Sequence, residues 1–188
     1  MVFEVITKPT KAFQNAISEE NLGAAIVTAI VAGTLFGIAG LLITGNAIQF
    51  AINFSVPVIQ WIVISVIAWA FYIMFRKKKL GELSLAQIAS ATGELWTLFV
   101  ILGVIIAIGT YALTSFGNIG IMLPISIALF AIIIIIGIIF MVDWFIMIKT
   151  MLEAENKKAF IVWILMVITH GLLFLFINSA LNATILSM

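Results

Sequence analysis

Residues 121–148 read IMLPISIALFAIIIIIGIIFMVDWFIMI, a continuous apolar stretch that is interrupted by one charged residue, Asp143. A helix needs about 20 apolar residues to cross the hydrocarbon core of a bilayer. A membrane β-strand is shorter and alternates apolar with polar residues, which this stretch does not do. Residues 121–148 therefore predict a transmembrane helix.

Four further stretches have the same character, and the five together predict an all-α integral membrane protein with a bundle of five transmembrane helices. The predicted spans cover roughly residues 22–44, 56–75, 95–114, 121–148 and 159–181, within a single domain of residues 1–188. The composition agrees, because 64% of the residues are hydrophobic and 9% are charged. A soluble domain is nearer half apolar and a quarter charged, and it has no means of burying so much apolar surface.

The basic residues predict the orientation of these spans. They precede the first span, or lie between the second and third or between the fourth and fifth: Lys8, Lys11, Arg76, Lys77, Lys78, Lys79, Lys149, Lys157 and Lys158. Residues 45–55, residues 115–120 and the tail after residue 181 carry no charge. Because cytoplasmic loops carry an excess of lysine and arginine, we expect a multi-pass protein of the cell membrane with a cytoplasmic N-terminus. With five spans, its C-terminus is then outside.

Four tryptophans lie near the ends of the predicted spans. Trp96, Trp144 and Trp163 are near the cytoplasmic ends, and Trp61 is near an outer end. Tryptophan is enriched at both membrane–water interfaces, where its ring meets the headgroups. The positions therefore predict an aromatic belt.

Two short amphipathic helices are expected on the cytoplasmic face. The first covers residues 10–18, where Phe13 and Ile17 share a face, and Ser18 is the expected N-cap of the first span. The second begins after Ser84, which has capping-box spacing with Gln87. We expect both helices to anchor at the membrane surface, and docking of a partner protein is the alternative.

A stripe of small residues runs along the first span, where Ala25, Ala29, Gly33 and Gly37 recur every four residues. Small residues let helix backbones approach closely in a membrane, where lipid supplies no hydrophobic drive for association. We expect the stripe to pack against another span of the same chain. The alternative is that it joins two copies of the chain in a homo-oligomer.

Few polar side chains fall within the predicted spans, and ionisable residues there are functional candidates by default. Glu94 and Asp143 lie at similar depth near the cytoplasmic side, and we expect each to pair with a nearby lysine or to cap a helix. The alternative is that the two are adjacent and form one cation- or proton-binding site. His170, the only histidine, is expected to form a hydrogen bond with a facing group, and a proton relay is its alternative role.

The basic run after the second span is a candidate contact surface. It consists of Arg76, Lys77, Lys78 and Lys79. Such runs commonly signal topology and contact anionic lipids. The alternative is a contact with an acidic partner protein.

Several kinds of chemistry have no signature in the sequence. The absence of cysteine excludes disulfides, thiolate nucleophiles and cysteine-ligated metals. We find no P-loop, no H-E-x-x-H, no G-x-S-x-G and no acidic cluster suited to magnesium. The net charge of +1 gives no electrostatic pull toward nucleic acid. We therefore expect no metal, no cofactor, no nucleic-acid partner and no enzymatic activity.

Three groups of residues give the chain a family resemblance. They are Lys8-Pro9-Thr10-Lys11-Ala12-Phe13 before the first span, Leu83-Ser84-Leu85-Ala86-Gln87-Ile88 with Gly93 before the third, and Trp144, Met151-Leu152-Glu153-Ala154 and Lys158-Ala159 around the last loop. With five spans, this pattern resembles the Yip (Ypt-interacting protein) domain family in its bacterial and archaeal form. The chain departs from the family's common tyrosine and proline after the glycine of span three, where it has Glu94, Leu95 and Trp96.

The resemblance implies a non-enzymatic membrane protein. Eukaryotic members of that family act in vesicle trafficking and associate with Rab-type GTPases through long cytoplasmic N-terminal regions, and only 21 residues precede span one here. We therefore expect a membrane scaffold that binds lipids, or a cytoplasmic or membrane protein, without expecting GTPase binding. The runner-up is a small transporter, or the membrane subunit of one, which a polar lumen and broken helices would favour. A membrane enzyme ranks third.

Overall fold

The computed structural model describes the backbone of residues 2–76, 83–116 and 119–186, with side chains over residues 4–76, 83–115 and 122–175. In these ranges the chain forms seven helices: α1 (Val2–Thr7), α2 (Pro9–Glu19), α3 (Leu22–Thr44), α4 (Ala47–Phe75), α5 (Leu85–Phe116), α6 (Ile119–Leu152) and α7 (Asn156–Leu186). Helices α3 to α7 are long and apolar enough to cross a membrane. The prediction of an all-helical fold with five candidate spans is therefore confirmed.

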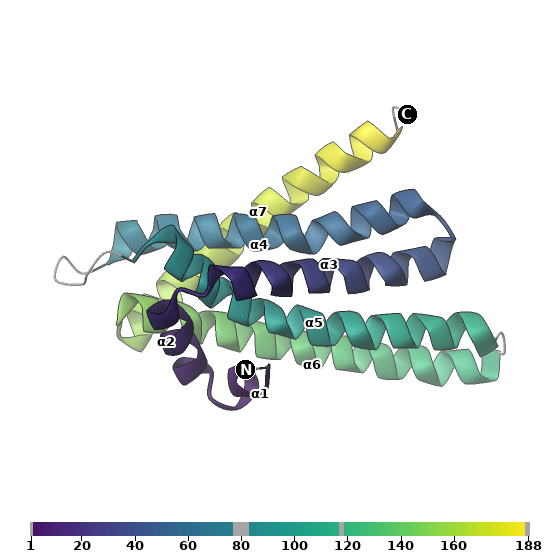
Figure 1. The fold of residues 1–188 in the computed structure, drawn as a ribbon, viewed down its shortest axis with the longest axis horizontal. Helices are drawn as coiled ribbons and strands as arrows, with labels where there is room; N and C mark the ends of the chain where they lie inside the picture. The colour runs from purple at the N-terminus through teal and green to yellow at the C-terminus, as the bar shows by residue number, and fades with distance from the viewer. Residues whose placement is uncertain (1, 77–82, 117–118, 187–188) are drawn as a thin grey trace.

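Helices α3, α4, α5 and α6 run side by side along the long axis of the molecule, and α7 packs on α4 and α6 at an angle to them (Figure 1). Helices α1 and α2 fold against one end of this bundle (Figure 1). The most extensive packing joins α3 to α5 and α3 to α4. Helix α3 is therefore the centre of the architecture.

Helix α4 begins about two turns before residue 56, where the second span is predicted to start, so residues 47–55 belong to the helix and not to a loop. Asn46 caps the helix, since its side-chain oxygen accepts a hydrogen bond from the backbone N–H of Ile48 at 2.8 Å. Two polar side chains in the extra turns satisfy each other, because Gln49 Nε2 donates to Asn53 Oδ1 at 3.0 Å. Polar residues that are typical of a loop in the sequence thus form the first turns of a helix.

The capping box at the start of α5 is confirmed, but the helix it begins is not a separate one. The backbone N–H of Gln87 donates to Ser84 Oγ at 3.0 Å, and the backbone N–H of Ser84 donates to Gln87 Oε1 at 2.9 Å. The helix then continues without a break to Phe116. The expected cap of α3 is wrong, because Asn21, not Ser18, accepts the hydrogen bond from Ala24 N, at 3.0 Å.

Helix α2 packs on the bundle through its apolar face. Phe13 is completely buried, and α2 lies against α5 and α6. Gln87 Nε2 of α5 also donates to the backbone carbonyl of Ile17 in α2 at 3.1 Å. The apolar face of this helix is therefore covered by protein and is not available for anchoring in lipid.

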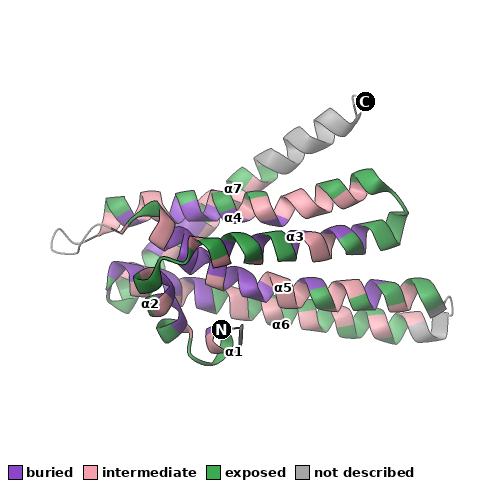
Figure 2. Ribbon diagram, viewed as in Figure 1, coloured by how far each residue is buried: buried purple, intermediate pink, exposed green. Residues whose placement is uncertain are grey.

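The buried core lies toward the end of the bundle where α2 packs, and the opposite half is largely exposed (Figure 2). Trp96 and Trp144 are 0% and 1% exposed, so the expectation that they belong to an aromatic belt is wrong. Burial of Trp96 is made favourable by a hydrogen bond from its indole N–H to the carbonyl of Pro57 at 3.0 Å. Trp61, also buried, donates in the same way to the carbonyl of Ala89 at 3.3 Å.

The small-residue stripe of α3 is occupied by other helices of the same chain. A Cβ atom on Gly33 would lie 2.5 Å from the carbonyl oxygen of Phe54, and one on Gly37 would lie 2.8 Å from the ring of Phe50. Ala25, at the other end of the stripe, contacts the backbone of α5 at Gly93. The structure thus uses the stripe to bring both α4 and α5 close to α3.

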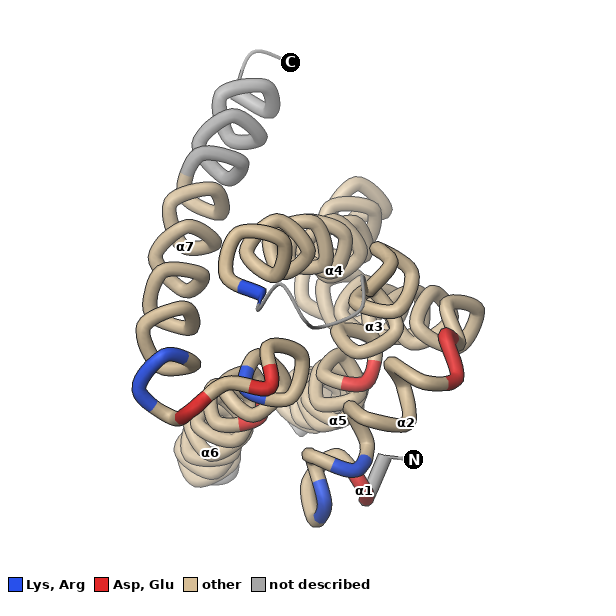
Figure 3. Tube along the Cα trace, turned by 90° about the vertical axis from the view of Figure 1, so that its left-hand side faces the viewer, with Lys and Arg blue, Asp and Glu red and all other residues tan. Residues whose placement is uncertain are grey.

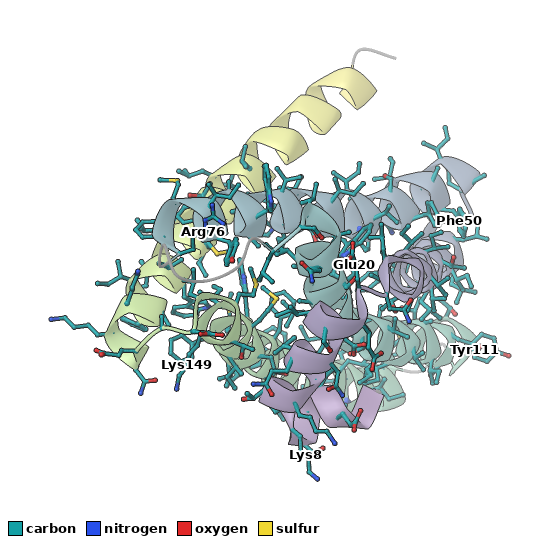
Figure 4. All side chains as sticks on the ribbon, turned by 60° about the vertical axis from the view of Figure 1, so that its left-hand side comes forward. Lys8, Glu20, Phe50, Arg76, Tyr111 and Lys149 are labelled. Carbon is teal, nitrogen blue, oxygen red and sulfur yellow. The ribbon has the colours of Figure 1, made fainter. Side chains whose placement is uncertain are left out.

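Gly37→Ala is expected to lower the free energy of unfolding by about 1 kcal/mol, because the ring of Phe50 (labelled in Figure 4) must move to admit the methyl group. Gly171→Ala is the matched control, since nothing lies within 4 Å of a Cβ atom at Gly171. Thermal unfolding in detergent measures both. A loss of stability in the control as large as that at Gly37 would contradict the assigned packing.

Candidate functional site

Glu94 lies where α5 crosses α3, next to the close contact between Gly93 and Ala25. It borders a cavity of about 160 Å³ between α1, α2, α3 and α5, whose lining is about half polar. The other polar residues of the lining are Glu4, Asn15, Glu19, Asn21, Thr28 and Ser90. One carboxylate oxygen of Glu94, Oε2, is buried, and none of the described residues forms a hydrogen bond with it.

Asp143 lies in α6 and is 3% exposed. It is not among the residues that border the Glu94 cavity. Like Glu94, it has one carboxylate oxygen, Oδ2, that is buried without a hydrogen-bond partner. Each of the two acidic residues thus has one carboxylate oxygen without a hydrogen bond from the described residues. The structure does not bring the two residues together around this cavity.

The acidic lining does not amount to a metal centre. Over the described parts of the chain, no three or more histidine, cysteine, aspartate or glutamate side chains are grouped closely enough to hold a metal ion. The carboxylates around the small cavity come from different helices and are interspersed with amides and hydroxyls. This lining can satisfy water or a small polar group through hydrogen bonds.

His170 is packed among aromatic rings. Its ring meets the ring of Trp144 edge-on, with centroids 5.8 Å apart, and stacks on Phe174 with centroids 6.3 Å apart. Trp144 in turn contacts Phe140 of α6, and Phe140 contacts Phe99 of α5. The described contacts of His170 therefore place it within a row of rings that joins α5, α6 and α7.

The basic run is only partly described. Arg76 follows the last residue of α4, whereas Lys77, Lys78 and Lys79 lie outside the described residues. Lys158 of α7 donates from Nζ to the carbonyl of Phe75 at 2.6 Å, which ties the end of α4 to the start of α7. The described charged residues gather at this end of the bundle, which faces the viewer in Figure 3.

A larger cavity at the same end was not foreseen from the sequence. Its volume is about 800 Å³, and it is lined by α2, α4, α5 and α6 and by the residues that flank α5 and α6. Its lining mixes amide and hydroxyl groups with apolar side chains and includes Lys149, labelled in Figure 4, and Glu153. The spacing of residues within each helix carries no signal for this cavity, because it forms between helices that are distant in sequence.

Asp143→Asn is expected to raise the free energy of unfolding by about 1 kcal/mol. The substitution removes a carboxylate whose Oδ2 atom is buried without a partner, and such atoms carry an uncompensated desolvation cost. Glu153→Gln is the matched control, because Glu153 is exposed and its substitution should change stability little. Chemical unfolding in detergent measures both, and a loss of stability in Asp143→Asn would show that this carboxylate is satisfied in the native protein.

Comparison of the chain with family models, with curated proteins and with solved structures found no match. Functional assignment therefore depends on the geometry described above.

Proposed function

We propose that the chain is a non-enzymatic, multi-pass membrane protein that acts as a scaffold, binding lipids or a partner protein at its cytoplasmic end. The observation that carries this proposal is the cavity of about 800 Å³ at the charged end of the bundle. Its volume is within the range of pockets that hold ligands, about 300–1,000 Å³. Its mixed polar and apolar lining suits a headgroup or the side chains of a partner.

The interior of the bundle supports a binding role over transport. Aromatic side chains fill the core around Trp96. The buried hydroxyls of Ser65 and Thr92 are 2.6 Å apart and bond to each other. Each hydroxyl also lies within hydrogen-bond distance of a helix carbonyl, Ser65 of Trp61 O and Thr92 of Ala89 O, so one hydroxyl donates to the other and the second donates to its carbonyl. A substrate path would instead present polar groups to a lumen.

The orientation is part of the same proposal. The charged end of the bundle, with α1, α2 and the α6–α7 turn, faces the cytoplasm, because the basic residues concentrate there. The opposite end, with the α3–α4 connection and the end of α5, faces outward. The cell membrane is the proposed location, and the resemblance to the Yip family agrees with this arrangement.

A small transporter is the second candidate, and one observation favours it. Glu94 and Asp143 each keep a buried carboxylate oxygen without a hydrogen-bond partner. Carboxylates of this kind within membrane helices mark ion and proton pathways in pumps and transporters. On this account the two residues act in sequence along a path, since they do not share the Glu94 cavity.

A photo-crosslinking residue at Gln14, which is exposed and borders the large cavity, tests the proposal in native membranes. We expect one dominant adduct, with a single lipid species or a single protein. The control is a crosslinker at Ile108, which is 65% exposed and lies in the half of α5 that is farther from the large cavity. It should yield a mixture of lipids. The same mixture of lipid adducts at both positions would contradict the scaffold. If proteoliposomes also showed a cation or proton flux that Asp143→Asn abolishes, the two results together would support the transporter instead.

A further inference from the structure

Helices α6 and α7 leave an open apolar groove between them. It runs from Ile134 to Phe145 on α6 and from Phe160 to Trp163 on α7, and its volume is about 620 Å³. Ile138 and Phe160, which line it, are 60% and 50% exposed. Gly137 deepens the groove, because nothing lies within 4 Å of where its Cβ atom would be. In the proposed orientation this groove faces lipid.

The length of the groove matches one leaflet of a membrane. Ile134 and Phe145 are separated by about 16 Å along the helix axis, at ~1.5 Å per residue. The hydrocarbon core of a bilayer is about 30 Å thick, so one leaflet contributes about 15 Å. The groove therefore reaches from near the middle of the membrane to its cytoplasmic surface, as one acyl chain does.

Three aromatic rings form the cytoplasmic end of the groove. Phe160 and Trp163 stack with centroids 5.7 Å apart, and Phe145 meets both rings edge-on with centroids 6.4 Å apart. The indole Nε1 of Trp163 is covered by protein atoms and, among the described residues, has no hydrogen-bond partner. The three rings therefore offer an acyl chain an apolar surface at this end of the groove.

Lysines stand beyond this end of the groove. Lys149 lies one turn beyond Phe145 on α6, where it also lines the cavity of about 800 Å³. Lys157 lies in the first turn of α7, and both lysines are exposed. The neighbouring Lys158 is already bonded to the carbonyl of Phe75. Glu153 and Glu155 lie between the two lysines in the sequence, in the turn that joins α6 to α7.

We propose that the α6–α7 groove binds one anionic phospholipid of the cytoplasmic leaflet. One acyl chain fills the groove against the rings of Phe145, Phe160 and Trp163, and Lys149 and Lys157 hold the headgroup. The inference rests on the proposed membrane scaffold and names its lipid. A helix of a second copy is the less suitable occupant, because helix–helix contacts in membranes favour small residues on both sides and the groove offers only Gly137.

The test uses the full chain in phosphatidylcholine vesicles that contain a minor fraction of brominated phosphatidylglycerol or, in parallel, of brominated phosphatidylcholine. Bromine quenches the fluorescence of nearby tryptophan. The difference in quenching between the wild type and Trp163→Phe gives the part of the quenching that is due to Trp163. We expect phosphatidylglycerol to occupy the site with roughly tenfold or greater preference, from about 1 kcal/mol per lysine near the membrane surface.

Two pairs of variants locate the binding. Gly137→Leu should fill the groove and abolish the preference, whereas Gly171→Leu, where there is also open space for a side chain, should not. The double variant Lys149→Gln/Lys157→Gln should lower the preference toward unity, whereas Lys8→Gln/Lys11→Gln, which alters exposed lysines at the start of the chain, should leave it in place.

Equal quenching by the two brominated lipids, or an unchanged preference in Gly137→Leu, would overturn the inference and show ordinary boundary lipid only. Concentration-dependent energy transfer between labelled copies that Gly137→Leu removes would also overturn it, in favour of a homo-oligomer. The scaffold proposal stands if the Gln14 adduct persists through these results. Loss of that adduct with the lipid preference intact would remove the scaffold proposal and leave the lipid site.

Discussion

Gly93→Ala is expected to destabilise the protein by about 3 kcal/mol, although it adds a single methyl group. The Cβ atom would overlap the Cβ atom of Ala25 and lie 2.6 Å from its Cα atom. The obstacle is the backbone of α3, which cannot turn aside as a flexible side chain would. Overpacking of this kind costs about 1–3 kcal/mol in well-packed cores, and α3 with α5 forms the most extensive contact of the fold.

Gly137→Ala is the control for this prediction. It makes the same change in the interior of a helix, but nothing lies within 4 Å of the added atom. It should gain about 1 kcal/mol, because alanine favours the helix more than glycine does. Thermal unfolding in one detergent compares the two variants, and equal stability of both would mean that α3 and α5 are not in close contact at Gly93.

Trp96→Ala is expected to cost about 4 kcal/mol, in the range found for removal of large buried aromatic side chains. Trp96 is fully buried, donates to the carbonyl of Pro57, and stacks on Phe99 with centroids 4.8 Å apart. The substitution therefore removes a hydrogen bond and opens a cavity where α4, α5 and α6 meet.

Trp96→Phe separates these contributions. It retains most of the volume and loses the indole N–H, so it should cost about 1 kcal/mol, the net value of one hydrogen bond. Ile138→Ala is the comparison on the exposed face of α6, where Ile138 is 60% exposed, and it should change stability little in detergent. A cost for Trp96→Ala no larger than that for Ile138→Ala would contradict the buried position of Trp96.

The five long apolar helices could be predicted because an apolar run of this length favours a helix in lipid, whatever its neighbours are. Helix α3 has the predicted bounds, and the capping box of Ser84 and Gln87 forms as its spacing indicates. The first turns of α4 could not be predicted from polarity, because Gln49 and Asn53 satisfy each other inside the helix. Where a polar residue finds its partner depends on the fold.

The candidate site shows the same limit. The depth of Glu94 and Asp143 along the bundle can be counted from the sequence, but the direction in which each side chain points depends on how the helices pack. The sequence predicts Trp96 at the membrane interface, yet its ring is in the core, where its indole N–H donates to the carbonyl of Pro57. The α6–α7 groove forms where two helices do not pack tightly against each other. The spacing of residues within either helix does not predict it.

Single-cysteine labelling tests most directly whether the protein spans a membrane with the charged end of its bundle in the cytoplasm. The chain has no cysteine, so each introduced one reports alone. Cysteines replacing Asn46 and Ser115, both exposed at the uncharged end, should react with an impermeant maleimide in intact cells. Cysteines replacing Gln14 and Ser84, exposed at the charged end, should react only after the cells are opened. Labelling of Gln14→Cys or Ser84→Cys in intact cells would contradict the account.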